Sequence, residues 1–398
     1  RTLSFKGYKL THVINITDVG HLTDDADAGE DKLEKAAAAR KQSIWDIAEH
    51  YKQAYWADVR ALNIRQPARW TVATDYVPQM IAFAQKIAPE HCYELDSGLY
   101  FDVGSVADYG RLARAATDEG EGRIEAVEGK RHPADFAIWR KTPPGEVRQM
   151  EWDSPWGRGA PGWHLECSVM SGEVLGFPFD IHTGGIDHRE IHHPNEIAQN
   201  QAFCCTNGLD NAANSGARMW MHNNFLVERS GKMSKSSGEF LRLQLLIDKG
   251  FHPLAYRMMC LQAHYRSELE FSWDGLAAAL TRLKRMVMAV EKANSGTGGA
   301  VDSRVVVQAS LDLNSFDGAI SDDLNLPKAL THLEFVLFDK SIPSSLKVYL
   351  VEKMDQVLGL NLLSLNRADL RIRPKAAAIT EAEIEAILAR RKEARAAK

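Results

Sequence analysis

Hydrophobic and polar positions follow two patterns in the chain up to about Leu241. Residues 8–17 carry a dense apolar run, which predicts a buried parallel strand. From Ser43 to Leu62, apolar residues recur every three or four positions, which predicts an amphipathic helix capped by the serine. The other elements expected here are strands at 99–103, 179–182 and 219–227, with Gly184-Gly185 breaking the second of these, and helices at 77–87 and 194–205. Strands that alternate with helices predict an α/β fold with a parallel sheet.

Helical spacing dominates the remainder of the chain. Its clearest apolar stripe consists of Leu276, Leu280, Leu283, Val287 and Val290. Further helices are expected at 327–338, 346–358 and 380–398, with a flexible glycine-rich break at 295–299. A bundle of α-helices is therefore predicted to follow the α/β region.

Length, charge and cysteine content narrow the function classes. The 398 residues suggest two or three domains, and the absence of an apolar stretch of about 18 residues argues against a membrane span. A formal net charge of −5 excludes a generally basic nucleic-acid coat but allows a local basic face. Five scattered cysteines disfavour a disulfide scaffold and fit a reducing, cytoplasmic compartment.

Sulfur, imidazole and carboxylate side chains gather in the middle of the sequence. On a helix, His192 and Glu196 stand four residues apart and share one face. Cys167 is expected to join them from a neighbouring strand or turn, which would give a reasonable zinc ligand set with one position left open. The alternative is a buried structural cysteine beside a histidine pair that caps a helix. The spacing matches no short zinc-finger pattern, so the residues alone leave both interpretations open.

Lysines and serines follow the strand expected at 219–227, in the order Gly231-Lys232-Met233-Ser234-Lys235-Ser236. Ammonium groups on such a loop can stabilise the charge that develops on a transferring phosphate. A solvated basic loop is the alternative. The specific order of the five residues from Lys232 to Ser236 is rarer than a bare run of charge and favours the phosphate role.

Polar groups also stand where two of the expected strands end. Residues 15–21, which include Thr17, follow the first strand, and His182 and Asp187 accompany the strand at 179–182. Open α/β sheets bind ligands at the carboxyl edge, although an ordinary turn would use the same residue types.

Seven segments together resemble one known family, the bacterial-type cysteinyl-tRNA synthetases, which are class I enzymes. The segments are NITDVGHLTDDADAGEDKLEK from Asn15, KRHPADFAIWRK from Lys130, WDSPWGRGAPGWHLECSVMS from Trp152, FDIHTGGID from Phe179, HHPNEIAQ from His192, GKMSKSSGEF from Gly231 and DDLNLPKAL from Asp322. The resemblance covers nearly the whole chain. KMSKS alone indicates only class I, whereas PGWHLEC with HHPNE is specific to the cysteine-activating members.

The resemblance implies that Cys167, His192 and Glu196 are three zinc ligands. The family's fourth ligand is a cysteine near the N-terminus, in a segment expected to precede these residues. Its zinc binds the substrate thiol directly and thereby rejects serine, because zinc stabilises a thiolate far better than a hydroxyl. A size filter would contribute only about 1–3 kcal/mol.

The resemblance also assigns the other substrate contacts. Thr17, Trp163, His182 and Asp187 match the amino-acid pocket, where Trp163 would form an apolar wall and Asp187 would hold the ammonium group. Lys232 and Lys235 match the catalytic lysines that steady ATP, with magnesium, and Met233, Ser234 and Ser236 complete that ATP-binding loop. The cysteine carboxylate would attack the α-phosphate, with positioning and electrostatics supplying the catalysis.

Some positions depart from the family pattern. The HIGH motif is expected just upstream of Arg1, and the anticodon-binding tail is expected to be cut after Lys398. Thr183 stands where a glycine is usual, and residues 188–191 replace a more apolar run. Because the ligand positions remain, a variant subgroup is favoured over lost activity.

The architecture implied is a Rossmann-type catalytic domain (1–66 and 158–230), a connective insertion (67–157), a KMSKS and stem-contact region (231–270), a helical bundle (271–366) and a linker that begins the anticodon-binding region (367–398). The expected partners of this cytoplasmic monomer are tRNA(Cys), cysteine and ATP, with no membrane. Arg390, Arg391, Lys392 and Arg395 would contact tRNA phosphates or form a solvated helix face.

Three other interpretations compete. A mycothiol-pathway ligase would share the zinc pocket and KMSKS loop but join cysteine to an amino-sugar; the insertion that begins at Thr23 and the long helical C-terminus disfavour it. A non-catalytic tRNA-binding paralogue would leave the retained ligands unexplained. A generic α/β nucleotide-binding protein would not account for the cysteine-specific motifs.

Overall fold

The computed structural model describes residues 1–19, 43–113, 128–204, 215–228, 242–296 and 303–397. Contacts between residues divide the chain into two compact units. We call them the α/β unit, which contains Lys9–Ala57 and Gln66–Phe225, and the helical unit, which contains Arg1–Tyr8, Asp58–Arg65 and Leu226–Lys398.

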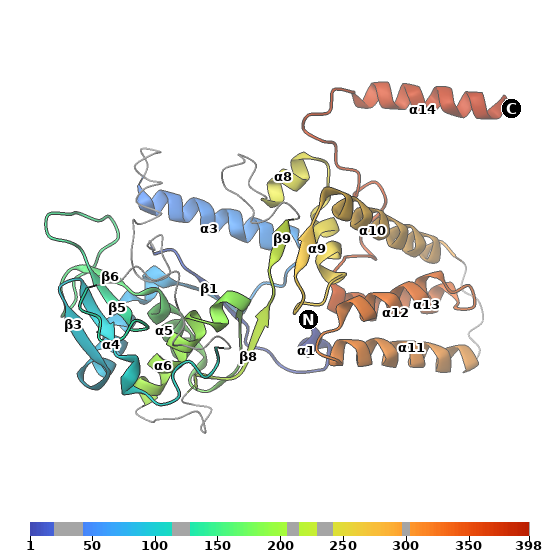
Figure 1. Cartoon of the computed structure of the whole chain (residues 1–398). Coiled ribbons are helices and arrows are strands. Elements are labelled where there is room, and N and C mark those ends of the chain that lie inside the picture. The colour runs from blue at the N-terminus through green and yellow to red at the C-terminus, as the bar shows by residue number, and fades with distance from the viewer. Residues whose placement is uncertain (20–42, 114–127, 205–214, 229–241, 297–302, 398) are drawn as a thin grey trace. The chain divides into compact units, whose positions relative to one another are not determined.

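The α/β unit alternates strands with helices, as the sequence predicts (Figure 1). Its elements are β1 (Val13–Ile16), most of α3 (Ile44–Ala61), β2 (Arg69–Val72), η1 (Ala73–Tyr76), α4 (Val77–His91), β3 (Cys92–Leu95), β4 (Gly98–Phe101), η2 (Val103–Ser105), β5 (Phe136–Lys141), β6 (Gly159–Pro161), α5 (Trp163–Leu175), β7 (Phe179–Gly185), η4 (Ile186–Arg189), α6 (His192–Cys204) and β8 (Ala217–Asn223). β1 pairs in parallel with β2, and β7 pairs in parallel with β8. The expected α/β class with parallel strands is confirmed.

Three details of the expected strands are wrong. β3, β4, β5 and β6 form an antiparallel four-stranded sheet, which the parallel pattern did not predict. β7 continues through Gly184 and Gly185, because these two residues pair with His222 and Asn223 of β8. The strand expected at 219–227 is two strands, of which the second, β9 (Leu226–Glu228), pairs with β10 (Leu269–Phe271) of the helical unit.

Apolar side chains of α4, α5 and the antiparallel sheet form the core of the α/β unit. Fully or nearly fully buried members include Met80, Phe101, Ile138 and Leu165. α6 packs against α4 and α5, and every residue from His192 to Ala202 is buried. A helix that is buried on all sides yet carries histidine, asparagine, glutamate and glutamine must have its polar groups matched by other polar groups or by a ligand.

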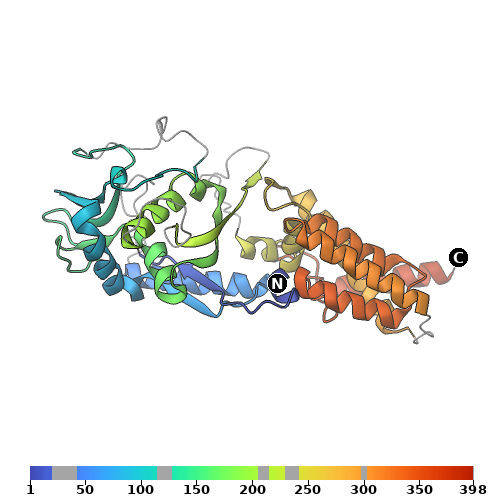
Figure 2. The same cartoon turned by 90° about the horizontal axis from the view of Figure 1, so that it is seen from below.

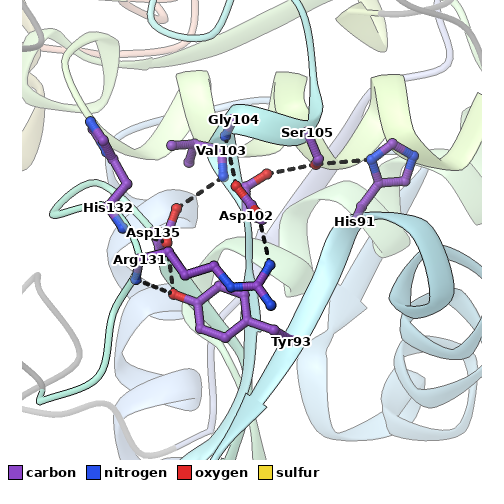
Figure 3. A network of polar contacts seen from close by, with 9 residues as sticks. All are labelled: His91, Tyr93, Asp102, Val103, Gly104, Ser105, Arg131, His132 and Asp135. Atoms are coloured by element: carbon purple, nitrogen blue, oxygen red, sulfur yellow. Dashed lines mark hydrogen bonds and ion pairs between the residues drawn. The ribbon is translucent and has the colours of Figure 1, made fainter.

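A polar network in the antiparallel region centres on Asp135, which is 1% exposed (Figure 3). Its carboxylate accepts hydrogen bonds from the Tyr93 hydroxyl at 2.6 Å, the Val103 amide at 3.0 Å and the His132 amide at 2.9 Å. Arg131 donates its amide to the Tyr93 oxygen and its guanidinium to Asp102. The segment from Lys130 to Phe136 is hydrogen-bonded to β3 and η2. Because each carboxylate oxygen of Asp135 has a donor, this buried charge is satisfied.

The helical unit contains α1 (Thr2–Phe5), α8 (Leu243–Asp248), α9 (Pro253–Leu261), α10 (Trp273–Asn294), α11 (Ser303–Ser321), α12 (Leu326–Phe338), α13 (Ser344–Leu358) and α14 (Glu381–Ala396). Helices α10 to α13 run alongside one another, as Figure 2 shows. The predicted stripe on α10 is buried at all five positions, and Ser272 caps that helix by accepting from the Gly275 amide at 3.0 Å. In α14, no residue is buried.

No helix in the described ranges has both the length and the apolar composition that crossing a membrane requires.

Candidate metal and amino-acid site

Helices α5 and α6 carry the three predicted metal ligands. Cys167 lies in α5, not in the strand or turn that we expected. The pattern of apolar and polar residues did not predict this helix, because most of its residues from His164 to Ser171 are buried. A helix without a solvent-facing polar side shows no helical period in its sequence. His192 and Glu196 lie on α6, one turn apart, as predicted.

The donor atoms of Cys167, His192 and Glu196 all lie within 4.8 Å of one another. His192 Nε2 is 3.1 Å from Glu196 Oε1. Asn15, at the end of β1, donates its side-chain amide to Cys167 Sγ at 3.4 Å. A sulfur, an imidazole nitrogen and a carboxylate oxygen that converge in this way form a donor set suited to zinc.

Glu196 is 1% exposed, and its Oε1 finds no hydrogen-bond donor of acceptable geometry among the described residues. Burial disfavours ionisation of this carboxyl, but His182 and His192 outweigh it and hold the pKa of Glu196 well below its usual range. Burial, with the charges of Glu196 and Glu166, raises the pKa of Cys167 well above that of a free thiol. A bound cation would satisfy the orphaned oxygen and stabilise the thiolate, so the residues present fit a metal ion.

Two more histidines face the same carboxylate. His182 Nε2, on β7, lies 3.4 Å from Glu196 Oε1, and His193 Nε2, on α6, lies 4.0 Å from it. Burial lowers the pKa of His193 to about 2, so its ring stays neutral. Burial also disfavours the charged form of His182, but Glu196 outweighs burial and raises its pKa. Three imidazoles therefore surround one carboxylate oxygen.

Two further histidines orient these rings, and sequence reasoning missed both. His164 Nδ1 lies 2.8 Å from His192 Nδ1, and His222 Nε2 lies 2.8 Å from His193 Nδ1. In each pair, one nitrogen donates and the other accepts, which leaves Nε2 of His192 or His193 turned toward Glu196. Metal-binding histidines are commonly held in this way through their second nitrogen. The only sequence signal was proximity: His164 precedes Glu166-Cys167 by two residues, and His222 lies near the end of an expected strand.

Gly184 lets the histidine rings approach the backbone of β7. A Cβ atom at this position would lie 2.7 Å from Cε1 of His193 and 2.8 Å from Nδ1 of His188. Contacts this short do not occur, so any side chain here would displace the rings. The glycine that the sequence offered as a strand breaker is instead needed for close packing of the cluster.

Comparisons with known proteins show the family of the chain. Residues 1–281 match the family described as "tRNA synthetases class I (C) catalytic domain". The chain belongs to this family.

Several members are similar over nearly the whole chain. The Cysteine–tRNA ligase of Novosphingobium aromaticivorans is 76% identical, with 100% of this chain and 80% of that protein covered. That of Zymomonas mobilis is 53% identical, covering 98% and 81%. A Mycobacterium tuberculosis methionyl-tRNA synthetase in complex with methionyl-adenylate has the same fold, with a TM-score of 0.56, 14% identity and coverage of 94% and 82%.

In this class I tRNA synthetase, two of the residues predicted to contact the amino acid, His182 and Trp163, lie among the histidines near Glu196. His182 faces Glu196, and the Trp163 ring lies 4.6 Å from the His192 ring, measured between centroids. Asp187 is exposed in η4, where its charge acts on His188.

Thr17 is exposed at the end of β1, two residues beyond Asn15. The next residue, Asp18, is buried and has a structural role, because it accepts from the Thr74 amide at 3.0 Å and the Thr74 hydroxyl at 2.6 Å. The predicted ATP-binding residues Lys232, Met233, Ser234, Lys235 and Ser236 lie outside the described residues.

Proposed function

We propose that this protein is a cysteine–tRNA ligase that activates cysteine with ATP and transfers it to the 3′ end of tRNA(Cys). Membership of the class I family and the names of relatives at 76% and 53% identity support the ligase activity and the amino acid. The observation that carries the choice of cysteine is the convergence of Cys167, His192 and Glu196, whose donor atoms lie within 4.8 Å of one another.

In this proposal, zinc held by Cys167, His192 and Glu196 supplies a soft Lewis acid that prefers the substrate thiolate to the hydroxyl of serine. The chain's own residues prepare the site. Asn15 hydrogen-bonds the sulfur of Cys167, and His164 fixes the ring of His192. These contacts reduce the freedom of the ligands before substrate arrives, which favours a selective site.

Other residues of the α/β unit would hold the rest of the amino acid. Trp163 packs beside His192 and would form the apolar wall of the pocket. Asp187 is an exposed carboxylate close enough to act on His188, and it would attract the substrate ammonium group. Thr17 and His182 would complete the pocket.

ATP would bind with magnesium to the KMSKS segment, in which Lys232 and Lys235 would balance phosphate charge during adenylate formation. The cysteine carboxylate is itself the nucleophile, so no covalent enzyme intermediate is required. The catalytic contribution of the chain would be placement of the two substrates and stabilisation of charge.

The domain boundaries given by the resemblance stay predictions, as do the cytoplasmic location and the monomeric state. The connective insertion would include β3, β4 and β5 of the antiparallel sheet and would help seat the acceptor end of tRNA. Arg390, Arg391, Lys392 and Arg395 lie on α14, which has no buried residue, so they are accessible to tRNA phosphates.

The decisive experiment compares acceptors and amino acids with the full-length protein. We expect cysteine-dependent exchange of pyrophosphate into ATP, little exchange with serine, and transfer to tRNA(Cys). Cys167→Ser should lower kcat/KM for cysteine by at least about 100-fold, because loss of a ligand should exceed the 10–100-fold effect of losing an orienting partner.

Cys260→Ser is the matched control, since Cys260 lies on α9 of the helical unit and should leave exchange unchanged. Transfer to an amino-sugar in place of tRNA would favour the mycothiol-pathway alternative. Binding of tRNA without any exchange would favour a non-catalytic paralogue.

A further inference from the structure

The carboxylate of Glu196 belongs to two groups of converging donors. One group contains Cys167 and His192, and the other contains His182 and His193. The second group includes no sulfur and comes from β7 and α6 alone. We infer that His182, His193 and Glu196 form a second position for a divalent metal ion, which overlaps the cysteine-containing position and is independent of Cys167.

The spacing of the second group suits a metal ion. Two nitrogen or oxygen ligands of a tetrahedral zinc ion lie about 3.3 Å apart, given metal–ligand bonds of about 2.0–2.1 Å. His182 Nε2 is 3.4 Å from Glu196 Oε1, and His193 Nε2 is 4.0 Å from the same oxygen. A shift of about 0.7 Å at His193 would bring its Nε2 to the spacing from Glu196 Oε1 that a shared zinc ion requires.

The ring of His193 is held in the orientation that a ligand needs. Its Nδ1 lies 2.8 Å from Nε2 of His222, so Nε2 is the nitrogen that faces Glu196. The backbone of Gly184 closes the other side, where a Cβ atom would be 2.8 Å from Nε2 of His193. A ring fixed by a hydrogen bond on one edge and by close packing on the other loses little further freedom when it binds an ion.

The shared oxygen decides how the two positions are used. Oε1 of Glu196 is the atom closest to His182, His192 and His193, so one ion at a time satisfies it. Two imidazoles and a carboxylate suit borderline divalent cations such as zinc, cobalt or nickel. Zinc would prefer the position that includes the thiolate, and the second position would hold an ion when Cys167 cannot.

The experiment uses the metal-free full chain titrated with cobalt(II), whose absorption spectrum distinguishes sulfur from nitrogen and oxygen ligands. We expect the unmodified protein to bind one ion with a thiolate-to-cobalt band. Cys167→Ala should still bind one ion without that band, at an affinity at least about 100-fold lower, because the loss of a thiolate ligand exceeds the effect of losing an orienting partner. Adding His193→Ala to Cys167→Ala should weaken binding by at least a further factor of about 10.

The double variant Cys167→Ala with His188→Ala is the matched control, because the His188 ring lies beside that of His193 but belongs to neither donor group. The affinity of this double variant for cobalt(II) should stay within about twofold of that of Cys167→Ala. His193→Gln, which keeps the size and polarity of the side chain, repeats the test if His193→Ala unfolds. Circular dichroism and thermal unfolding verify that each variant is folded.

Failure of folded Cys167→Ala to bind cobalt(II) at millimolar concentration would overturn the second position. An equal affinity for cobalt(II) in Cys167→Ala and in Cys167→Ala with His193→Ala would also overturn the second position. The proposed ligase fails by different results, namely no cysteine-dependent exchange, or no thiolate band in the unmodified protein.

Discussion

Asp135 and Glu196 are both buried carboxylates of the α/β unit, each 1% exposed, but their surroundings are opposite. Asp135 accepts three hydrogen bonds of 2.6–3.0 Å from Tyr93, Val103 and His132. Glu196 Oε1 faces three imidazole nitrogens at 3.1–4.0 Å without an acceptable hydrogen bond from the described residues. The chain itself satisfies the carboxylate of Asp135 with hydrogen bonds, whereas the carboxylate of Glu196 is arranged to contact a bound ligand.

The difference separates a structural carboxylate from a binding one. Burying a charge costs free energy unless partners replace the lost water, and for Asp135 hydrogen bonds do so. At Glu196 the fold tolerates an incompletely satisfied charge close to the Cys167 thiol, whose pKa is raised. A buried carboxylate oxygen without a hydrogen bond, beside groups whose pKa values are shifted, indicates a ligand-binding site.

The largest effect is expected on activity at Glu196. Glu196→Gln removes an anionic ligand, so cysteine-dependent pyrophosphate exchange should fall by at least about 100-fold. Asp135→Asn is the paired control and should keep exchange within a few-fold of the unmodified protein. Equal losses of activity in the two variants would show that the comparison is mistaken.

The next effect concerns stability at Asp135. Asp135→Ala leaves the Tyr93 hydroxyl and the amides of Val103 and His132 without their acceptor, so the free energy of unfolding of the α/β unit should fall by roughly 3 kcal/mol. Hydrogen exchange of the backbone amides of β4 and β5 measures this loss of unfolding free energy. Asp102→Ala, which removes the exposed acceptor of the Gly104 amide and the partner of the largely exposed Arg131, should cost less, about 1 kcal/mol. A cost at Asp135 no greater than that at Asp102 would contradict the assignment.

The smallest effect is a pH dependence at Tyr93. Burial, followed by the hydrogen bond to Asp135, raises the pKa of Tyr93 to about 12 from 10.0. The unfolded phenol therefore ionises first, so this stabilisation is complete below pH 10 and is lost as the pH rises toward 12. Stability should fall less steeply over this interval in Tyr93→Phe, as followed by urea unfolding. Tyr8→Phe, at an exposed tyrosine, should retain the slope of the unmodified protein, and a matching slope in Tyr93→Phe would count against the prediction.

Sequence reasoning succeeded where a helix has one apolar face. The bounds of α12 and α13 were predicted within two residues, and the apolar stripe predicted for α10 is buried, because a solvent-facing side gives the apolar positions of these helices a clear period. It failed for α5, which is largely buried, and for the antiparallel sheet β3–β6, whose short strands are set by pairing with distant segments.

The sequence by itself determined that His192 and Glu196 share a face, because a helix brings residues four apart together whatever surrounds it. It also carried the family's motifs, and thereby the expectation of a thiol-selecting ligase. Only the tertiary structure decided that Cys167 approaches from α5, that Asn15 contacts its sulfur, and that His164 and His222 orient the rings. Those contacts join residues that are 28 or more positions apart, and packing, which no local pattern encodes, fixes their distances.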